Sequence, residues 1–254
     1  MAIRFDHKPG LVIYLTVGDP SLAATKAIAL AAIDAGADVL ELGVPFSDPL
    51  ADGPVIQRAM ERALAQNVSL HDVIRLAAEI RAERPQAGLV VFSYLNPILR
   101  YGLKKFADDA AAAGVDGVLA TDMIVEEATE YLAELDRAGL APVFLAAPTS
   151  PDERLKAIAE HSKGFIYAIS RTGITGKQQT MTSDASALVG RIRRWSRLPV
   201  AVGFGISNAQ HVAQVTEFAD AAVIGSAIVD LIERSTPGEA PDAVARFIRG
   251  LRQQ

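Results

Sequence analysis

The stretch Val39–Ala59, VLELGVPFSDPLADGPVIQRA, decides the predicted fold, because it joins an apolar segment to a proline-rich loop and then to a helix. Residues 38–42 have the length and apolar character of a buried strand, yet they include a carboxyl group, that of Glu41. Burial at the carboxyl end of a strand disfavours the charged form of this group and raises its pKa. Such a group suits proton transfer near neutral pH, so we expect Glu41 to be catalytic.

The loop after this strand has an uncommon composition. Residues Gly43–Pro54 include three prolines and two glycines, which is too many for a helix or an interior strand. The loop carries two more acids, Asp48 and Asp52, and can bring either one over the glutamate. It also carries Phe46 and Leu50, for which we see no internal partner, so we expect a binding loop that packs on a ligand or another chain.

The rest of the chain repeats a unit of one apolar strand and one helix. Near-continuous apolar strands are typical of a parallel sheet that is buried on both faces. The expected strands are Leu11–Val17, Val39–Leu42, Gly88–Tyr94, Gly117–Ala120, Val143–Ala146, Phe165–Ile169, Val200–Val202 and Ala221–Ile224. Eight units in 254 residues predict an α/β protein, a (β/α)8 TIM barrel that forms a single domain over residues 1–254, with an open doubly wound sheet as the alternative.

The helices are expected where Ala, Ile and Leu recur at helical spacing, often with Gly or Pro at the end. Asp19 before Pro20 is expected to cap the first of them. The expected helices are Ser21–Ala35, Val55–Ala65, Leu70–Arg84, Leu103–Ala113, Val125–Ala138, Asp152–His161, Asp184–Trp195, Asn208–Phe218, Ala227–Glu233 and Pro241–Arg252.

Composition argues against several function classes. A net charge of -5 and a single Trp give no basic surface for nucleic acid. The absence of cysteine removes disulfides, thiolate nucleophiles and sulfur metal sites, and the four histidines show no ligand spacing, so we expect no metal. The start is polar, and no uncharged run reaches the ~20 residues of a membrane span. We expect a cytoplasmic protein.

Glycines follow the last two expected strands. In a TIM barrel the active site lies at the carboxyl ends of the strands. Gly203 and Gly205 follow the seventh strand, Gly225 and Ser226 follow the eighth, and a helix begins after each pair. Glycine lets an anion approach backbone N–H groups, and a helix N-terminus adds partial positive charge. The two turns therefore predict a phosphate site.

Further candidates lie on neighbouring strands. Residues 170–183, SRTGITGKQQTMTS, form a long polar segment after the sixth strand, and we expect it to act as a closing lid rather than as an ordinary loop. Tyr94 ends the third strand and Tyr167 lies within the sixth. Either tyrosine can line the site or serve as a core or turn residue.

The sequence LELGVPFSDPLADGP closely resembles the tryptophan synthase alpha subunit. Further matches run nearly end to end in order: YLTVGDPS, SYLNP, GVDGVLATD, YAISRTGITG, VGFGIS and VIGSAIV. The resemblance implies a TIM-barrel lyase of tryptophan and aromatic amino-acid biosynthesis, which cleaves indole-3-glycerol phosphate to indole and glyceraldehyde 3-phosphate. It also implies an αββα heterotetramer with a beta subunit that holds pyridoxal phosphate, and no cofactor in this chain.

The same resemblance implies roles for single residues. Glu41 is similar to the family's catalytic acid and base, and Asp52 to the aspartate that pairs with the indole N–H. Tyr167 resembles the tyrosine beside that glutamate, Thr175 resembles the lid threonine that meets the loop aspartate, and Tyr94 is expected to contact substrate. The residues that resemble the family's phosphate site are Gly176, Gly203, Gly205, Gly225 and Ser226.

The chain also departs from the family pattern. Ile13 and Ile124 stand where the family usually has proline, and the latter lies in a loop that in relatives is near the beta interface. The polar start is shorter than the family's leading helix, so we expect a less protected first strand.

Three other functions fit the sequence less well. A phosphoribosylanthranilate isomerase would need a cysteine, which this chain lacks, and a thiamine-phosphate-synthase-like barrel would need a cluster of magnesium-binding acids, which we do not see. A non-catalytic activator of a beta-type partner would not need both Glu41 and Asp52.

Overall fold

The structure, a computed structural model, describes residues 3–169, 178–203 and 205–252. Its strand segments form one parallel sheet in the order β5-β4-β3-β2-β1-β9-β8-β7-β6. Their bounds are β1 Gly10–Thr16, β2 Val39–Gly43, β3 Gly88–Ser93, β4 Gly117–Ala120, β5 Ala141–Pro142, β6 Leu145–Ala146, β7 Ile166–Ile169, β8 Val200–Gly203 and β9 Ala221–Ile224.

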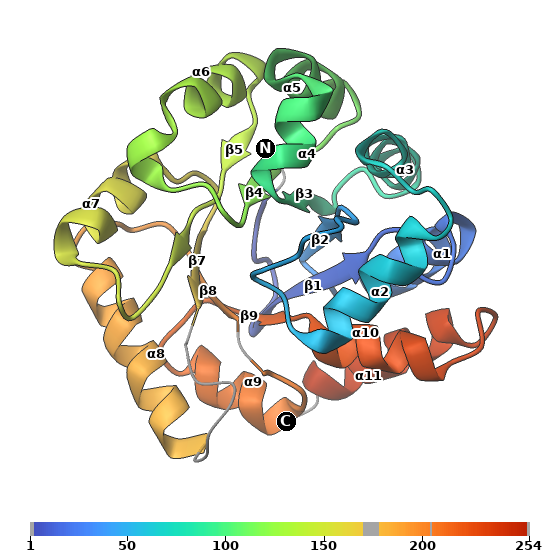
Figure 1. The fold of residues 1–254 in the computed structure, drawn as a ribbon. Helices are drawn as coiled ribbons and strands as arrows, with labels where there is room; N and C mark the ends of the chain where they lie inside the picture. The colour runs from blue at the N-terminus through green and yellow to red at the C-terminus, as the bar shows by residue number, and fades with distance from the viewer. Residues whose placement is uncertain (1–2, 170–177, 204, 253–254) are drawn as a thin grey trace.

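The expected fifth strand, Val143–Ala146, is observed as two outer segments, because β5 precedes it at Ala141–Pro142 and only β6 lies within it. Between them, the N–H of Val143 donates to the carbonyl oxygen of Val118 in β4 at 2.9 Å. The carbonyl oxygen of Phe144 accepts from the N–H of Tyr167 in β7 at 3.2 Å. Residues 141–146 therefore join β4 to β7 and close the ring of strands (Figure 1). The predicted barrel is confirmed, and the open sheet is wrong.

Helices surround this ring on its outer side (Figure 1). They alternate with the strands along the chain, as a parallel barrel requires. Their bounds are α1 Leu22–Asp34, α2 Pro54–Leu64, α3 Leu70–Glu83, α4 Leu95–Tyr101, α5 Leu103–Ala112, α6 Thr129–Ala138, α7 Asp152–His161, α8 Gln178–Ile192, α9 Ala209–Thr216, α10 Ser226–Arg234 and α11 Ala240–Arg252, with a short 3-10 helix, η1, at Val125–Glu127.

Three of these helices differ from the prediction. α4 was not expected, and it begins where the carboxylate of Asp122, from the loop after β4, accepts from the Leu95 N–H at 2.7 Å. The expected helix Val125–Ala138 is divided into η1 and α6. α8 begins at Gln178 instead of Asp184, so the end of the expected lid is helical.

The start of α1 also differs from the prediction. Ser21, not Asp19, is the N-cap, and its hydroxyl oxygen accepts from the Ala24 N–H at 3.1 Å. Asp19 instead accepts two hydrogen bonds from Arg62 of α2. The N-cap therefore lies two residues later than expected, and Asp19 forms a tertiary ion pair instead.

Side chains alternate between two apolar layers. Val12 and Val39 point into the barrel, whereas Leu11 and Leu40 face the helices. The interior layer consists of Ile3, Val12, Val39, Val90, Leu119, Ala141, Val143, Phe165, Ala201, Ala221 and Val223. This alternation decides which residues can reach a site inside the barrel.

The amino-terminal segment covers the barrel floor. Ile3 is buried in the interior layer, and the ring of Phe5 meets that of Phe165 edge-on at 6.0 Å. Every residue of β1 is buried, including Ile13. The expectation of a less protected first strand is therefore wrong, because two side chains of the short segment seal the floor.

Candidate active site

Glu41 lies inside the barrel. Its neighbours Leu40 and Leu42 belong to the outer apolar layer, so its own side chain shares the interior face with Val39. The residue is 1% exposed, and no residue that the structure describes donates a hydrogen bond to either carboxyl oxygen. Burial raises the pKa of Glu41 from 4.5 to about 8. Its carboxyl group is therefore mostly protonated at neutral pH.

Asp52 is held by Tyr94. The tyrosine hydroxyl donates to Asp52 Oδ2 at 2.7 Å and accepts from the Ala51 N–H at 2.9 Å. Burial raises the pKa of Asp52, and the hydrogen bond from Tyr94 opposes that rise. Asp48, the other acid of the loop, is exposed. The structure thus brings Asp52, and not Asp48, to the site.

The loop is folded onto the barrel rather than free. The ring of Phe46 packs on that of Tyr94, with centroids 5.0 Å apart. The side-chain amide of Gln57, on α2, donates to the carbonyl oxygen of Asp52 at 2.8 Å. Leu50, in contrast, is 94% exposed. The expectation that both apolar side chains lack an internal partner is wrong for Phe46, and Leu50 alone points outward.

Two phenols share the interior with the acids. Removal from water raises the pKa of Tyr14 and of Tyr167 well above 10.0, and the negative charges of Glu41 and Asp52 raise both further. Tyr14 is paired with Glu41 in the register of β1 and β2, and Tyr167 packs against the interior layer. Thr16 donates a hydrogen bond to the Tyr14 hydroxyl at 3.4 Å.

Each phenol lies against a glycine that ends a neighbouring strand. A Cβ atom on Gly43 would come within 2.5 Å of Tyr14 Cζ, and a Cβ atom on Gly203 within 2.6 Å of Tyr167 Cζ. Any larger residue would push the rings out of place. Gly203, which the sequence predicts as a phosphate residue, therefore also makes room for Tyr167.

Tyr14 is the residue that the sequence analysis missed. The sequence pattern shows it only as part of an apolar strand. The signal is its register, because its Cα is paired with that of Glu41 on the adjacent strand. Residues paired across a parallel ladder lie on the same face, so an aromatic hydroxyl beside the interior acid could have been found.

The predicted phosphate turns lie near these groups. Gly225 precedes α10. A Cβ atom placed on it would lie 3.7 Å from Tyr14 Cβ and 3.8 Å from Ile56 Cδ1 of α2. Ser226 is the first residue of α10. Gly205 has φ +58, a left-handed conformation that favours glycine. Thr175 and Gly176 lie outside the described residues.

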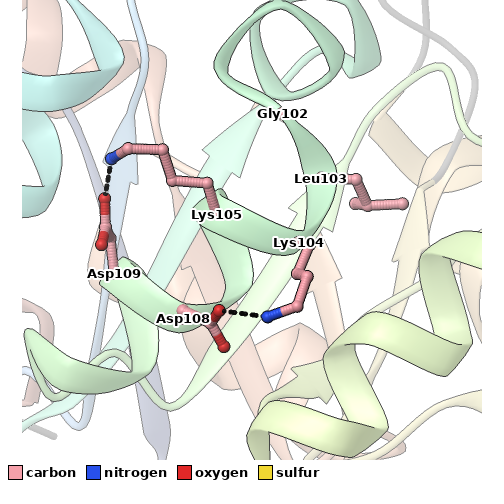
Figure 2. A pocket seen from close by; sticks show the side chains of 6 residues that line it. All are labelled: Gly102, Leu103, Lys104, Lys105, Asp108 and Asp109. Carbon is pink, nitrogen blue, oxygen red and sulfur yellow. Dashed lines mark hydrogen bonds and ion pairs between the residues drawn. The ribbon is translucent and has the colours of Figure 1, made fainter.

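An opening of about 450 Å3 lies elsewhere, beside α5, and is lined by Gly102, Leu103, Lys104, Lys105, Asp108 and Asp109 (Figure 2). Its charged side chains pair along the helix, Lys104 with Asp108 at 2.9 Å and Lys105 with Asp109. Both aspartates of this opening are paired with lysines, unlike the buried carboxyl group of Glu41.

The described part of the chain shows neither a metal site nor a membrane-spanning helix. It contains no group of three His, Asp or Glu side chains placed to hold a metal ion. None of its helices has the length and apolar character that crossing a membrane requires.

The fold and the site together define a class of protein. A TIM barrel that keeps one carboxyl group protonated and holds a second by a tyrosine hydroxyl can give a proton to one atom of a substrate and accept one from another. This arrangement is typical of an enzyme of acid–base chemistry.

Comparison with known proteins gives the family. The sequence model of the family described as "Tryptophan synthase alpha chain" matches residues 2–251. The tryptophan synthase alpha chain of Solibacter usitatus is 48% identical over 238 residues, which cover 94% of this chain and 89% of that one. The chain belongs to the tryptophan synthase alpha chain family, lyases that cleave indole-3-glycerol phosphate in tryptophan biosynthesis.

Solved structures agree with this family. Tryptophan synthase subunit alpha from Legionella pneumophila has a TM-score of 0.87 at 36% identity, covering 96% of this chain and 92% of that chain. A structure of the tryptophan synthase complex from Pyrococcus furiosus has a TM-score of 0.87 at 38% identity, covering 96% of this chain and 98% of that chain. These similarities extend over almost the whole barrel.

Proposed function

We propose that Glu41 and Asp52 carry out the cleavage of indole-3-glycerol phosphate in this chain. The observation that carries the proposal is the environment of Glu41, which is buried inside the barrel with a pKa raised to about 8. A carboxyl group in this state holds a proton at neutral pH and can give it to carbon.

The reaction divides into two proton transfers and one bond cleavage. Glu41 gives its proton to indole C3, while Asp52 accepts the hydrogen bond of the indole N–H and stabilises the positive charge that develops on the ring. The hydroxyl group on the first carbon of the glycerol chain then loses its proton to the Glu41 carboxylate. The bond from C3 to that carbon breaks, its electron pair restores the aromatic indole, and the carbon becomes the aldehyde of glyceraldehyde 3-phosphate.

The two acids suit different roles because their surroundings differ. The hydroxyl of Tyr94 donates to Asp52 and so favours its charged form. Glu41 accepts no hydrogen bond from a described residue, so its neutral form is favoured. Tyr14 and Tyr167, inside the barrel, would contact the indole ring. Tyr94 thus acts through Asp52 as well as being a candidate substrate contact.

The phosphate of the substrate would bind at the two glycine turns, with Gly203, Gly205, Gly225 and Ser226, completed by Gly176. Support comes from Gly225 at the N-terminus of α10, beside Tyr14, because a helix N-terminus offers free N–H groups to an anion. Thr175 would hold the Asp52 loop from the lid.

The chain would work with a beta chain that holds pyridoxal phosphate, in an αββα assembly, and would itself need no cofactor. One relative of similar fold is described as a tryptophan synthase complex. Leu50, 94% exposed at the tip of the loop that bears Asp52, gives such a partner an apolar contact.

The test is incubation of the purified chain with indole-3-glycerol phosphate, assayed for indole with and without a beta chain. Glu41→Gln should lower the rate by roughly 10²–10⁴, the range of general acid–base catalysis, and leave binding of glyceraldehyde 3-phosphate intact. Asp48→Asn, a change of the exposed acid in the same loop, is the control and should stay close to wild type. Cleavage by Glu41→Gln within a few-fold of wild type would contradict the assignment.

A further inference from the structure

Helix α2 touches two parts of the site at once. Near its N-terminus, Gln57 donates to the carbonyl oxygen of Asp52 at 2.8 Å. The neighbouring Ile56 packs near Gly225, because a Cβ atom placed on this glycine would lie 3.8 Å from Ile56 Cδ1. The position of α2 therefore affects both the loop acid and the turn that precedes α10.

Four charged side chains hold this helix against the barrel. Arg62 of α2 binds Asp19, in the loop after β1, through two hydrogen bonds of 2.8 Å each. A third nitrogen of Arg62 donates to Glu233 of α10 at 2.8 Å. Arg58, one turn earlier on α2, binds the same Glu233 at 2.7 and 3.0 Å. We call Asp19, Arg58, Arg62 and Glu233 the α2 network.

The geometry of the α2 network favours precise placement. A guanidinium group is planar, and a two-bond contact with a carboxylate fixes direction as well as distance. The side chain of Asp19 is only 3% exposed, so one end of the network is anchored in the protein. Arg58 and Glu233 are more exposed, and exposed ion pairs add little stability. A role in orientation explains the network better than a role in stability.

Glu233, the member of the α2 network that both arginines contact, also stays charged over the working pH range. The hydrogen bond from Arg58, and then the charges of Arg62 and Arg58, lower the pKa of Glu233 to about 2. Protonation of Glu41 near neutral pH therefore does not disturb these pairs. A defect in the network should shift rates without moving the pH dependence that Glu41 sets.

We propose that the α2 network is a positioning device that fixes α2 against α10 and thereby sets the distance between Asp52 and the turn at Gly225 and Ser226. The inference rests on the proposed function, in which these two places hold the indole and the phosphate of one substrate. None of the four residues touches the reacting atoms. A small error in their placement would misalign the substrate, which is costly for a reaction that depends on orientation.

The test compares a ligand that spans both places with ligands that fill only one. The probes are indole, glycerol 3-phosphate, and an uncleavable indole that carries a phosphate on a three-carbon chain. The variants are Glu233→Gln and Arg62→Lys, which remove the bridge to α10 and the two-bond contact with Asp19. The control is Asp230→Asn, on α10 with Glu233, because the hydrogen bond of Asp230 is to Arg234 at 3.0 Å and its charge acts on Arg58 only from a distance.

We expect both variants to bind the spanning ligand, and to cleave the substrate, about fivefold less well, as fits the loss of a partly exposed ion pair. Binding of the two separate fragments and the pH profile should be unchanged, and Asp230→Asn should behave as wild type. Equal losses for all three ligands, or variants that match the control, would refute the positioning role alone. A wild-type chain that does not cleave the substrate would instead refute the proposed function, and the inference with it.

Discussion

The raised pKa of Glu41 predicts how the stability of the protein depends on pH. In the folded chain this pKa is about 8, whereas the usual pKa of an exposed glutamate is 4.5. The folded state therefore holds the proton more tightly than the unfolded state does. The stabilisation is fully present below pH 4.5 and is lost as pH rises through about 8.

The size of this effect follows from the same two values. A rise from 4.5 to about 8 corresponds to a loss of up to about 5 kcal/mol in the free energy of unfolding between pH 4.5 and 9. Glu41→Gln cannot lose a proton, and its amide has nearly the volume of the protonated acid. We expect the variant to match the wild type near pH 5 and to be several kcal/mol more stable at pH 9.

Urea unfolding followed by circular dichroism from pH 5 to 9 measures this difference. Subtracting wild type from variant removes the contributions of all other titrating groups. Glu61→Gln, an exposed acid on α2, is the matched control and should give a flat difference. A Glu41→Gln difference that is equally flat would refute the buried, protonated state. The activity of the wild type should fall above pH 8, because Glu41, the proposed proton donor to C3, is then ionised.

Three further substitutions test the surroundings of the two acids. Tyr94→Phe removes the hydrogen bond to Asp52 and should cost about 1.5–3 kcal/mol, or roughly 10- to 100-fold in kcat/KM, while the acid limb of the pH profile moves to higher pH. Gly203→Ala should displace the phenol it faces and abolish most activity, whereas Gly190→Ala, which meets nothing within 4 Å, should not. Gly205→Ala, strained at φ +58, should weaken binding of glycerol 3-phosphate but not of indole, as titration of each ligand can show.

The barrel and its interior acid could be predicted because both depend on local pattern. Apolar runs of strand length alternate with segments whose apolar residues recur at helical spacing. Glu41 interrupts one such run near the end of a strand. α4 could not be predicted in this way. Its first turn is capped by Asp122, a residue from the next strand–helix unit, so the signal exists only after the strands have assembled.

Contacts inside the site were harder to predict for the same reason. Tyr14 reaches Glu41 through the register of two strands, which periodicity alone does not give. Phe46 was expected to face outward, yet it packs on Tyr94, the residue that also holds Asp52. An aromatic residue in a loop indicates that the loop packs on something, but the sequence does not tell which ring it meets.

The loop of residues 43–53 therefore combines two opposite properties. One side is fixed, because Phe46 and Asp52 both bind Tyr94. The other side presents Leu50 at 94% exposure, an apolar surface that gains free energy when another chain covers it. Since only a few residues separate these two sides, a partner that covers Leu50 acts directly on the segment that places Asp52. We therefore expect contact with a beta chain and placement of the Asp52 carboxylate to be linked within one short stretch of sequence.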